Sequence, residues 1–215
     1  QLSKKDKLFI SGYFGRDVFN FNSDDWGFKM NMPWGNATAS LRWNHLFSSK
    51  LFMNTSLIFS DYKYELNMTQ DLDSLPTTET SLFSGIRDWN LKNDFSYYPN
   101  PKHKIKFGSN YVFHKFNPTS FSGSYDNLDL EQIINYYAHE YGVYVNDEFD
   151  VNDRLLLNFG LRYSGFTQVG PFERQVKDNS GQIGQVSTDT TIIYGKGEIV
   201  EMYGGFEPRF SLRYL

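Results

Sequence analysis

The stretch that decides the fold is RLLLNFGLRYS, at residues 154–164. Its apolar residues recur at every second position from Leu155 to Tyr163, and Leu156, Asn158, Gly160 and Arg162 fall between them. Successive side chains of a β-strand point to opposite faces, so this stretch predicts a strand with one apolar face and one mixed face. The run FEPRFSLRY at 206–214 alternates in the same way.

The same period marks eight candidate strands along the chain. They cover about 7–18, 37–44, 51–64, 87–97, 104–114, 140–149, 154–164 and 206–214. The clearest runs have about 9–13 residues, whereas strands of soluble proteins have most often about 5–6. Such lengths favour strands that cross a membrane.

The composition agrees with an all-β protein and excludes several other classes. Alanine, the best helix former, occurs three times, and aromatic residues make up 18% of the chain. There is no cysteine, which excludes a disulfide scaffold and a thiolate metal site. The net charge of −4 gives no basic face for nucleic acid. No apolar run is long enough for a transmembrane helix.

The connections between these strands are alternately short and long. The short ones, at 47–50, 98–103 and 150–153, contain Ser, Pro, Asn and Asp, the residues that build tight turns. The long ones run through about 19–35, 67–85, 117–139 and 167–203. One plain end and one elaborate end are typical of transmembrane β-barrels, with short periplasmic turns and long extracellular loops.

The two faces of the strands indicate which side meets lipid. One face is nearly free of charge and has aromatic residues near both strand ends, among them Trp43, Tyr97, Tyr62 and Phe166. The other face is polar and is expected to face the lumen; its key residues are Arg42, Lys92, Asp94, Lys106, Arg162, Arg209 and Arg213. We therefore expect an antiparallel up-and-down transmembrane β-barrel.

Several stretches together resemble one known family. EYGVYVNDEF at 140–149 leads through a turn into RLLLNFGLRY at 154–163, which resembles a barrel hairpin of TonB-dependent outer-membrane receptors. The run at 206–214 is similar to that family's next strand, and HKIKFG at 103–108 and FNP at 116–118 are similar to the strand before. The richness in Asn, Lys and Tyr is similar to that of Bacteroidetes members. The resemblance covers essentially all of the chain.

The resemblance implies a 22-stranded barrel around a plug domain, of which residues 1–215 are expected to form a segment of four hairpins with no plug domain present. It implies energy-coupled import of a scarce ligand (metal chelate, glycan or peptide) across the bacterial outer membrane. The chain would supply barrel wall, lumen and ligand-capturing loops, and would be neither an enzyme nor dependent on a cofactor. The expected partners are outer-membrane lipid, the plug domain and TonB complex through the parent chain, and a surface lipoprotein, but no nucleic acid.

Aromatic and acidic residues of the long connections are the ligand-binding candidates. They are Asp24, Asp25, Trp26 and Trp34 in the first connection and Tyr125, Tyr136 and Tyr137 in the third. Aromatic rings stack on planar chelates and sugar faces, and carboxylates accept hydrogen bonds from hydroxyl groups. The alternative is that these residues only pack the connections together. The four histidines show no metal-ligand spacing, and no residue stands out as a nucleophile.

Two other architectures fit the strand pattern. Eight strands suffice for a small closed outer-membrane barrel that serves as adhesin, anchor or pore. Its narrow interior would need its charges paired, whereas six basic inner residues face few acids here, which favours a wide lumen. A soluble β-propeller or sandwich is the other alternative, although no blade signature recurs along the chain.

Overall fold

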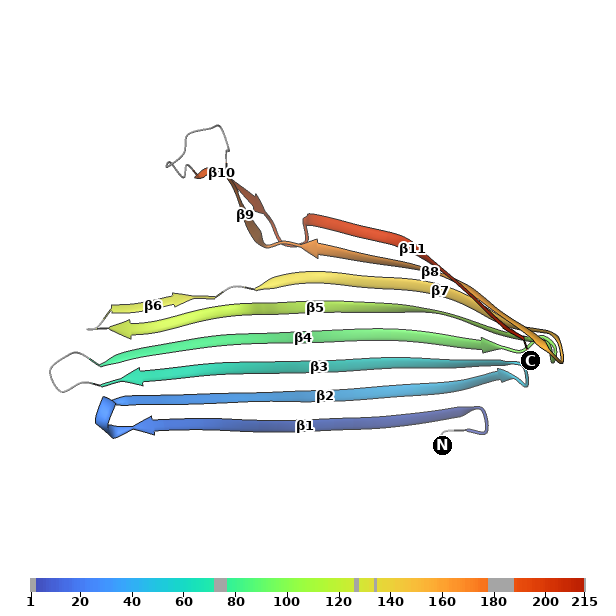
Figure 1. The fold of residues 1–215 in the computed structure, drawn as a ribbon, viewed down its shortest axis with the longest axis horizontal. Helices are drawn as coiled ribbons and strands as arrows, with labels where there is room; N and C mark the ends of the chain where they lie inside the picture. Colours follow the sequence, from blue (N-terminus) through green and yellow to red (C-terminus); the bar gives the residue numbers. More distant parts are fainter. Residues whose placement is uncertain (1–2, 72–76, 126–127, 134, 178–187, 215) are drawn as a thin grey trace.

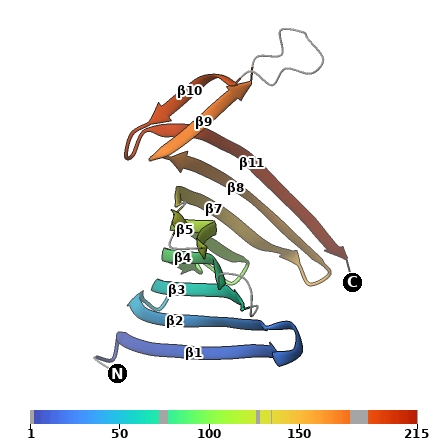
Figure 2. The ribbon, with the colours of Figure 1, turned by 90° about the vertical axis from the view of Figure 1, so that its left-hand side faces the viewer.

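The computed structural model describes residues 3–71, 77–125, 128–133, 135–177 and 188–214. These residues form one curved, single-layered antiparallel sheet with a small hairpin beside it (Figures 1 and 2). The strands follow one another in the order β1 (Asp6–Ser23), β2 (Phe28–Ser48), β3 (Leu51–Gln70), β4 (Thr78–Tyr97), β5 (His103–Tyr125), β7 (Tyr136–Asn152), β8 (Leu155–Val169) and β11 (Ile199–Tyr214).

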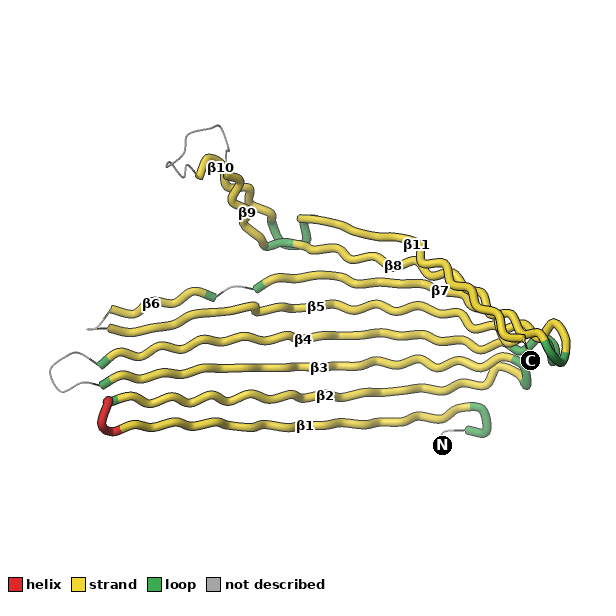
Figure 3. Tube along the Cα trace, viewed as in Figure 1, coloured by secondary structure: helices red, strands yellow, loops and turns green. Residues whose placement is uncertain are grey.

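Three further strands lie at the end of the sheet that carries the long connections. The strand β6 (Leu128–Gln132) pairs with β5, and β9 (Phe172–Lys177) pairs with β10 (Thr188–Tyr194) in a separate two-stranded sheet. The segment η1 (Asp24–Trp26) is one turn of 3-10 helix between β1 and β2, drawn in red in Figure 3. Within the described residues, no helix is long and apolar enough to span a membrane.

The eight predicted strands correspond in order to the eight strands of the main sheet, so the prediction of an antiparallel up-and-down sheet is confirmed. In the described residues β1 and β11 are the two ends of the strand order and do not pair with each other. The sheet is therefore an open arc, a partial barrel. It does not have the closure that the small-barrel alternative requires.

The short turns have the predicted chemistry, since in each a side-chain oxygen accepts a hydrogen bond from a backbone N–H two residues on. The Ser48 hydroxyl accepts from the N–H of Lys50 at 3.2 Å. The Asn100 side chain accepts from Lys102 at 2.9 Å, and Asn152 accepts from Arg154 at 3.0 Å. These local bonds fix where each strand reverses. The start of β1 and the end of β11 also lie at this end (Figure 1).

The prediction of four long loops was wrong for most of their length. Strands β1 and β2 run through nearly all of 19–35, and the hairpin closes through η1 and Gly27, whose φ of 54° suits glycine. The eight long strands of the main sheet consequently have 15 to 23 residues. Alternation continues in these outer parts with the two faces exchanged: Met30 on β2 and Tyr64 and Leu66 on β3 lie on the concave side. The predicted strands end near the point where the apolar residues change face.

The convex face of the sheet is apolar and exposed. Paired residues of neighbouring strands share a face, and one such row contains Ile10, Leu41, Leu57, Leu91 and Tyr111. Among the described residues no large side chain is fully buried, and Ile10 is 79% exposed. The apolar side chains therefore do not assemble into a core. Of the aromatic residues expected on this face, Tyr62 and Phe166 instead belong to the concave side.

The apolar band on the convex face has the height of a membrane. On β5 it runs from Ile105 to Phe113, nine residues, or about 27 Å along the strand and about 20 Å after tilting, near the apolar height of about 25 Å in barrels. The next outward-facing row contains Asp61, Arg87 and Lys115. Each long strand thus has a lower half that carries the apolar band and an upper half beyond it.

Candidate functional site

The concave face of the sheet holds a hollow of about 530 Å³. It is formed by β4, β5, β7, β8 and β11 and lined mainly by Lys92, Lys106, Asn110, Gly142, Tyr144, Asn146, Gly160, Arg162 and Arg209. The register places all seven predicted lumen residues on this face. Four of them line the hollow, while Arg42, Asp94 and Arg213 lie around it.

Glycines open the floor of the hollow. At Gly160, a Cβ atom would lie 2.7 Å from the side-chain oxygen of Asn146, and at Gly142 it would lie 3.3 Å from the Arg162 guanidinium. Larger residues at these positions would push both polar side chains aside. The period-two pattern alone could not identify this role, because a glycine fits either face.

On one side of the hollow, Asp94 joins two neighbours. Its carboxylate lies 3.1 Å from the Lys92 ammonium and accepts a hydrogen bond of 2.7 Å from the Tyr144 hydroxyl. Sequence reasoning missed Tyr144. The available signal was its position in the run 140–149, where it shares its face with Gly142 and Asn146.

On the other side, a short network joins β8 and β11. The Arg162 Nε donates to the Ser164 hydroxyl at 2.8 Å, and this hydroxyl donates to Glu207 at 2.6 Å. The Arg209 guanidinium lies 3.4 Å from the other oxygen of Glu207. Lys106 has no ion pair with any residue that the structure describes. Four bases thus face two nearby acids, Asp94 and Glu207, and the wall attracts anionic groups.

His114 lies above this hollow on the same face. Its Nδ1 is 2.8 Å from Asp88 and its Nε2 is 3.7 Å from Glu140. These contacts indicate that His114 is held in place by its hydrogen bond to Asp88. Over residues 3–71, 77–125, 128–133, 135–177 and 188–214, no group of three or more His, Cys, Asp or Glu side chains is placed to hold a metal ion.

The predicted ligand-binding residues do not form one cluster. Asp24, Asp25 and Trp26 sit together at the tip of the β1–β2 hairpin, where Trp26 is 69% exposed. Trp34 lies farther down β2, opposite Asp17 and Tyr64. The concave wall and this hairpin tip are therefore separate candidate surfaces.

The tyrosines of the third connection also separate. The Tyr136 ring meets Phe172 edge to face at 5.4 Å between centroids. Tyr137 stacks on Phe113 at 6.2 Å, on the convex side of the sheet. Tyr125 is the last residue of β5. These contacts favour a packing role for Tyr136 and Tyr137.

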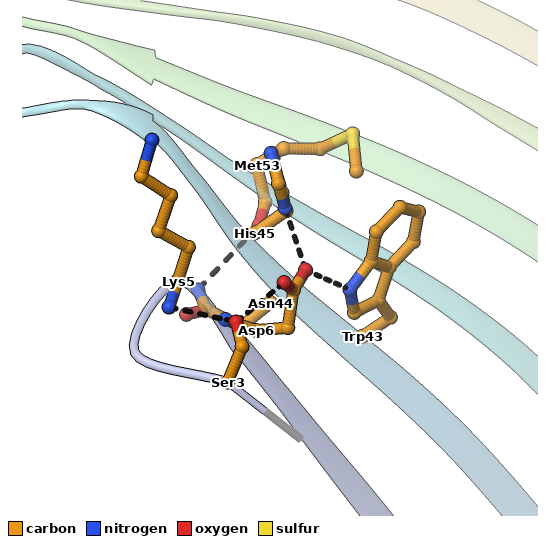
Figure 4. Close-up of polar contacts among 7 residues, drawn as sticks. All are labelled: Ser3, Lys5, Asp6, Trp43, Asn44, His45 and Met53. Atoms are coloured by element: carbon orange, nitrogen blue, oxygen red, sulfur yellow. Dashed lines mark hydrogen bonds and ion pairs between the residues drawn. The ribbon is translucent and has the colours of Figure 1, made fainter. Parts of the chain in front are cut away.

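The short-turn end carries a polar cluster around Asp6 (Figure 4). The Asp6 carboxylate lies 2.6 Å from His45 Nδ1, and it accepts hydrogen bonds from the Ser3 hydroxyl at 2.7 Å and the Trp43 indole at 3.0 Å. Because these contacts favour the charged form, above all that with His45, the pKa of Asp6 is lowered to about 2. The cluster ties the start of β1 to β2.

Comparison with known proteins decides the family. Residues 4–215 match the family model described as TonB dependent receptor-like, beta-barrel. The chain belongs to this family. A search of curated protein sequences gave no match. TonB-dependent receptors are outer-membrane proteins that carry a plug domain and interact with TonB, so the family implies the bacterial outer membrane.

Solved structures show the same fold. The chain is similar to BauA, the ferric preacinetobactin receptor of Acinetobacter baumannii, with 13% identity, a TM-score of 0.56, and coverage of 98% of this chain and 35% of that one. It is also similar to the ferric yersiniabactin uptake receptor FyuA of Yersinia pestis, with 13% identity, a TM-score of 0.53, and coverage of 99% and 31%. The chain spans about a third of the length of these receptors.

Proposed function

We propose that this chain is part of the barrel wall of a TonB-dependent receptor that imports a scarce ligand across the outer membrane, and that it has no catalytic role. The observation that carries the proposal is the pairing of an apolar convex band with a basic concave wall in a chain of this family. Lipid suits the first surface. A water-filled lumen or a plug domain suits the second, because buried unpaired charges are costly.

The concave wall supports two tasks in the parent protein. Lys92, Lys106, Arg162 and Arg209 would hold acidic groups of the plug domain, and they would guide an anionic ligand along the lumen. Lys106 is the member whose charge is uncompensated within the described chain. The acidic partner would therefore come from outside this segment.

The ligand class is proposed from two observations. The matched structures are receptors for ferric chelates, which supports a metal chelate before a glycan or a peptide. At the hairpin tip, the exposed Trp26 offers a flat apolar face beside Asp24 and Asp25. This arrangement suits first contact with a planar ligand that carries hydroxyl groups. The Asn, Lys and Tyr richness supports a Bacteroidetes-type receptor, for which a surface lipoprotein is a further partner.

The test uses the full-length protein that carries this chain, expressed in a Gram-negative host. We expect it in the outer-membrane fraction. We also expect uptake of radioactive iron supplied as catecholate, phenolate or hydroxamate chelates, and its abolition by an uncoupler. Accumulation insensitive to the uncoupler would indicate a passive pore, and a soluble protein would overturn the proposal altogether.

A charge variant tests the concave wall. The quadruple change Lys92→Gln, Lys106→Gln, Arg162→Gln and Arg209→Gln should lower uptake about tenfold or more while the protein still reaches the outer membrane, because the attraction for anionic partners is lost. The matched control removes four exposed bases at the short-turn end: Lys4→Gln, Lys5→Gln, Lys102→Gln and Arg154→Gln. Equal uptake by both variants would contradict a role for the concave wall.

A further inference from the structure

A row of bases begins where the apolar convex band ends. We call Arg16 on β1, Lys63 on β3, Arg87 on β4 and Lys115 on β5 the basic belt. All four lie at outward-facing positions of the register, in the two rows that follow the aromatic row of Phe59, Trp89 and Phe113. The chain as a whole has a net charge of −4, so this group of four bases differs in sign from the overall charge.

The belt stands at a defined height. Lys115 is two residues beyond Phe113 on β5, which places it about 7 Å farther along the strand. The side chains of the band below are uncharged on this face from Leu91 to Trp89 on β4 and from Phe107 to Phe113 on β5. The belt therefore lies at the level where acyl chains give way to headgroups.

Two hollows open between the bases. One, of about 360 Å³, lies over Gly35 and is lined by Phe14, Arg16, Lys63 and Glu65 among others. The other, of about 70 Å³, lies over Gly85 and is lined by Lys63, Arg87 and Lys115 among others.

The glycines keep these hollows open. A Cβ atom at Gly35 would lie 2.8 Å from the Gly15 carbonyl oxygen, and one at Gly85 would lie 3.0 Å from the Tyr62 carbonyl oxygen. Both distances are too short for a side chain to enter without backbone movement. The sheet surface thus remains accessible between long basic side chains.

The charges of the belt are directed outward. Asp61, with a side chain 16% exposed, lies 2.9 Å from Arg87 and 3.6 Å from Lys63. In the described part of the chain, Arg16 and Lys115 form no ion pair. Lys63 and Arg87 remain about half exposed despite their shared partner, so four bases are available against two acids, Asp61 and Glu65.

We propose that the basic belt binds the phosphorylated headgroups of lipids in the outer leaflet. Phosphate groups would lie over Gly35 and Gly85 between the bases, and acyl chains would lie along the aromatic row below. Arginine and lysine bind phosphate through charge-assisted hydrogen bonds. The continuity of the belt with the apolar band favours a lipid, because a lipid alone offers phosphate and acyl chain at this spacing. The inference rests on the proposed placement in the outer membrane.

The test is native mass spectrometry of the full-length protein, delipidated in detergent with a chelator present to remove bridging cations. The probes are a diphosphorylated lipid A, the same lipid with both phosphates removed, and inorganic phosphate. The belt variant is Arg16→Gln, Lys63→Gln, Arg87→Gln and Lys115→Gln. The control is the four-base variant of the short-turn end used above, which carries the same change of charge.

We expect the wild type and the control to bind the diphosphorylated lipid with similar affinity, and the belt variant to bind it about tenfold more weakly or worse, which corresponds to a loss of about 1.4 kcal/mol. Equal affinity of the belt variant, or equal binding of the dephosphorylated lipid, would overturn the inference. Competition by inorganic phosphate at equal concentration would indicate an anion site that does not recognise the lipid. This result would also overturn the inference.

Two readouts keep this inference apart from the proposed function. Outer-membrane fractionation and a mobility shift on boiling are measured for every variant. A wild-type protein that never reaches the outer membrane defeats the proposed function. A belt variant that reaches it, imports ligand and retains lipid like the wild type defeats this inference alone.

Discussion

The lower and upper halves of the same strands differ in side-chain chemistry but share one backbone ladder. Strands β3 and β4 pair without interruption from Leu51 opposite Tyr97 to Gln70 opposite Thr78. Below Phe59 and Trp89 the outward positions are apolar or uncharged, and above them the outward positions of β3 are charged or polar while Tyr62, Tyr64 and Leu66 lie on the inward face. Backbone hydrogen bonds therefore hold β3 and β4 together along their whole length. The side chains, in contrast, differ between the two halves according to the surroundings of each face.

The two halves therefore contribute differently to stability and to function. Under the proposed placement in the outer membrane, each strand of the lower half presents an apolar face to lipid and a polar face to the lumen, so a wrong residue is costly on the lipid side. In the upper half, the outward positions of β3 are charged or polar, so substitutions on that face are expected to be tolerated and its residues are free to serve headgroup contacts.

The largest expected effect separates the two halves on one strand and one face. Leu91→Arg, in the middle of the apolar band, should destabilise the full-length protein by about 2–4 kcal/mol in vesicles, because a guanidinium enters the hydrocarbon region. Ser81→Arg lies ten residues away on the same face of β4, and its cost should be about 0–1 kcal/mol. Denaturant unfolding in lipid vesicles measures both. Equal costs would remove the distinction between the halves.

A smaller effect tests packing on the concave side of the lower half. A Cβ atom at Gly108 would clash with the Asn93 carbonyl oxygen and lie 2.9 Å from the Tyr144 ring, so Gly108→Val should shift the backbone of the neighbouring strand and weaken the hydrogen bond from Tyr144 to Asp94. We expect a loss of about 1–3 kcal/mol in the free energy of unfolding.

The matched control for Gly108 is Gly12→Val on β1, where the nearest atom, the Thr38 carbonyl oxygen, is at 3.5 Å. This change should alter stability by less than about 1 kcal/mol. If Gly108→Val were as mild as the control, the close approach of Asn93 and Tyr144 to this glycine would be wrong.

The smallest effect concerns the short-turn end. The pKa of Asp6 is lowered to about 2 by its bonds to His45, Ser3 and Trp43, so its contribution to stability is present above the usual pKa near 4 and is lost as the pH falls through about 2. We expect the wild type to lose more stability than Asp6→Asn over this interval. Unfolding midpoints between pH 2 and 7 provide the measurement, and parallel curves would contradict the assigned contacts.

The lower halves of the long strands could be predicted from the sequence, whereas the upper halves were not predicted. Runs such as 154–164 alternate between an apolar face and a mixed face, and this places Arg162 and Arg209 on the same side. From Phe19 to Ser23 the alternation continues, but Phe19 and Phe21 lie on the concave face, so the pattern changes face although the strand does not end. The role of Tyr144 and of the glycines depends on which residues face each other across strands, and a single sequence does not contain that register.

The most direct test of the central claim is cysteine labelling along β3, since the chain has no cysteine of its own. Single changes Thr55→Cys, Leu57→Cys, Glu65→Cys and Asn67→Cys, all at outward positions, are exposed on intact cells to a membrane-impermeant maleimide. The account predicts labelling of the last two and protection of the first two, with labelling of all four only after solubilisation and unfolding. Labelling of Thr55→Cys and Leu57→Cys on intact cells, or protection of Glu65→Cys and Asn67→Cys, would contradict the division of each strand into a membrane-facing half and an exposed half.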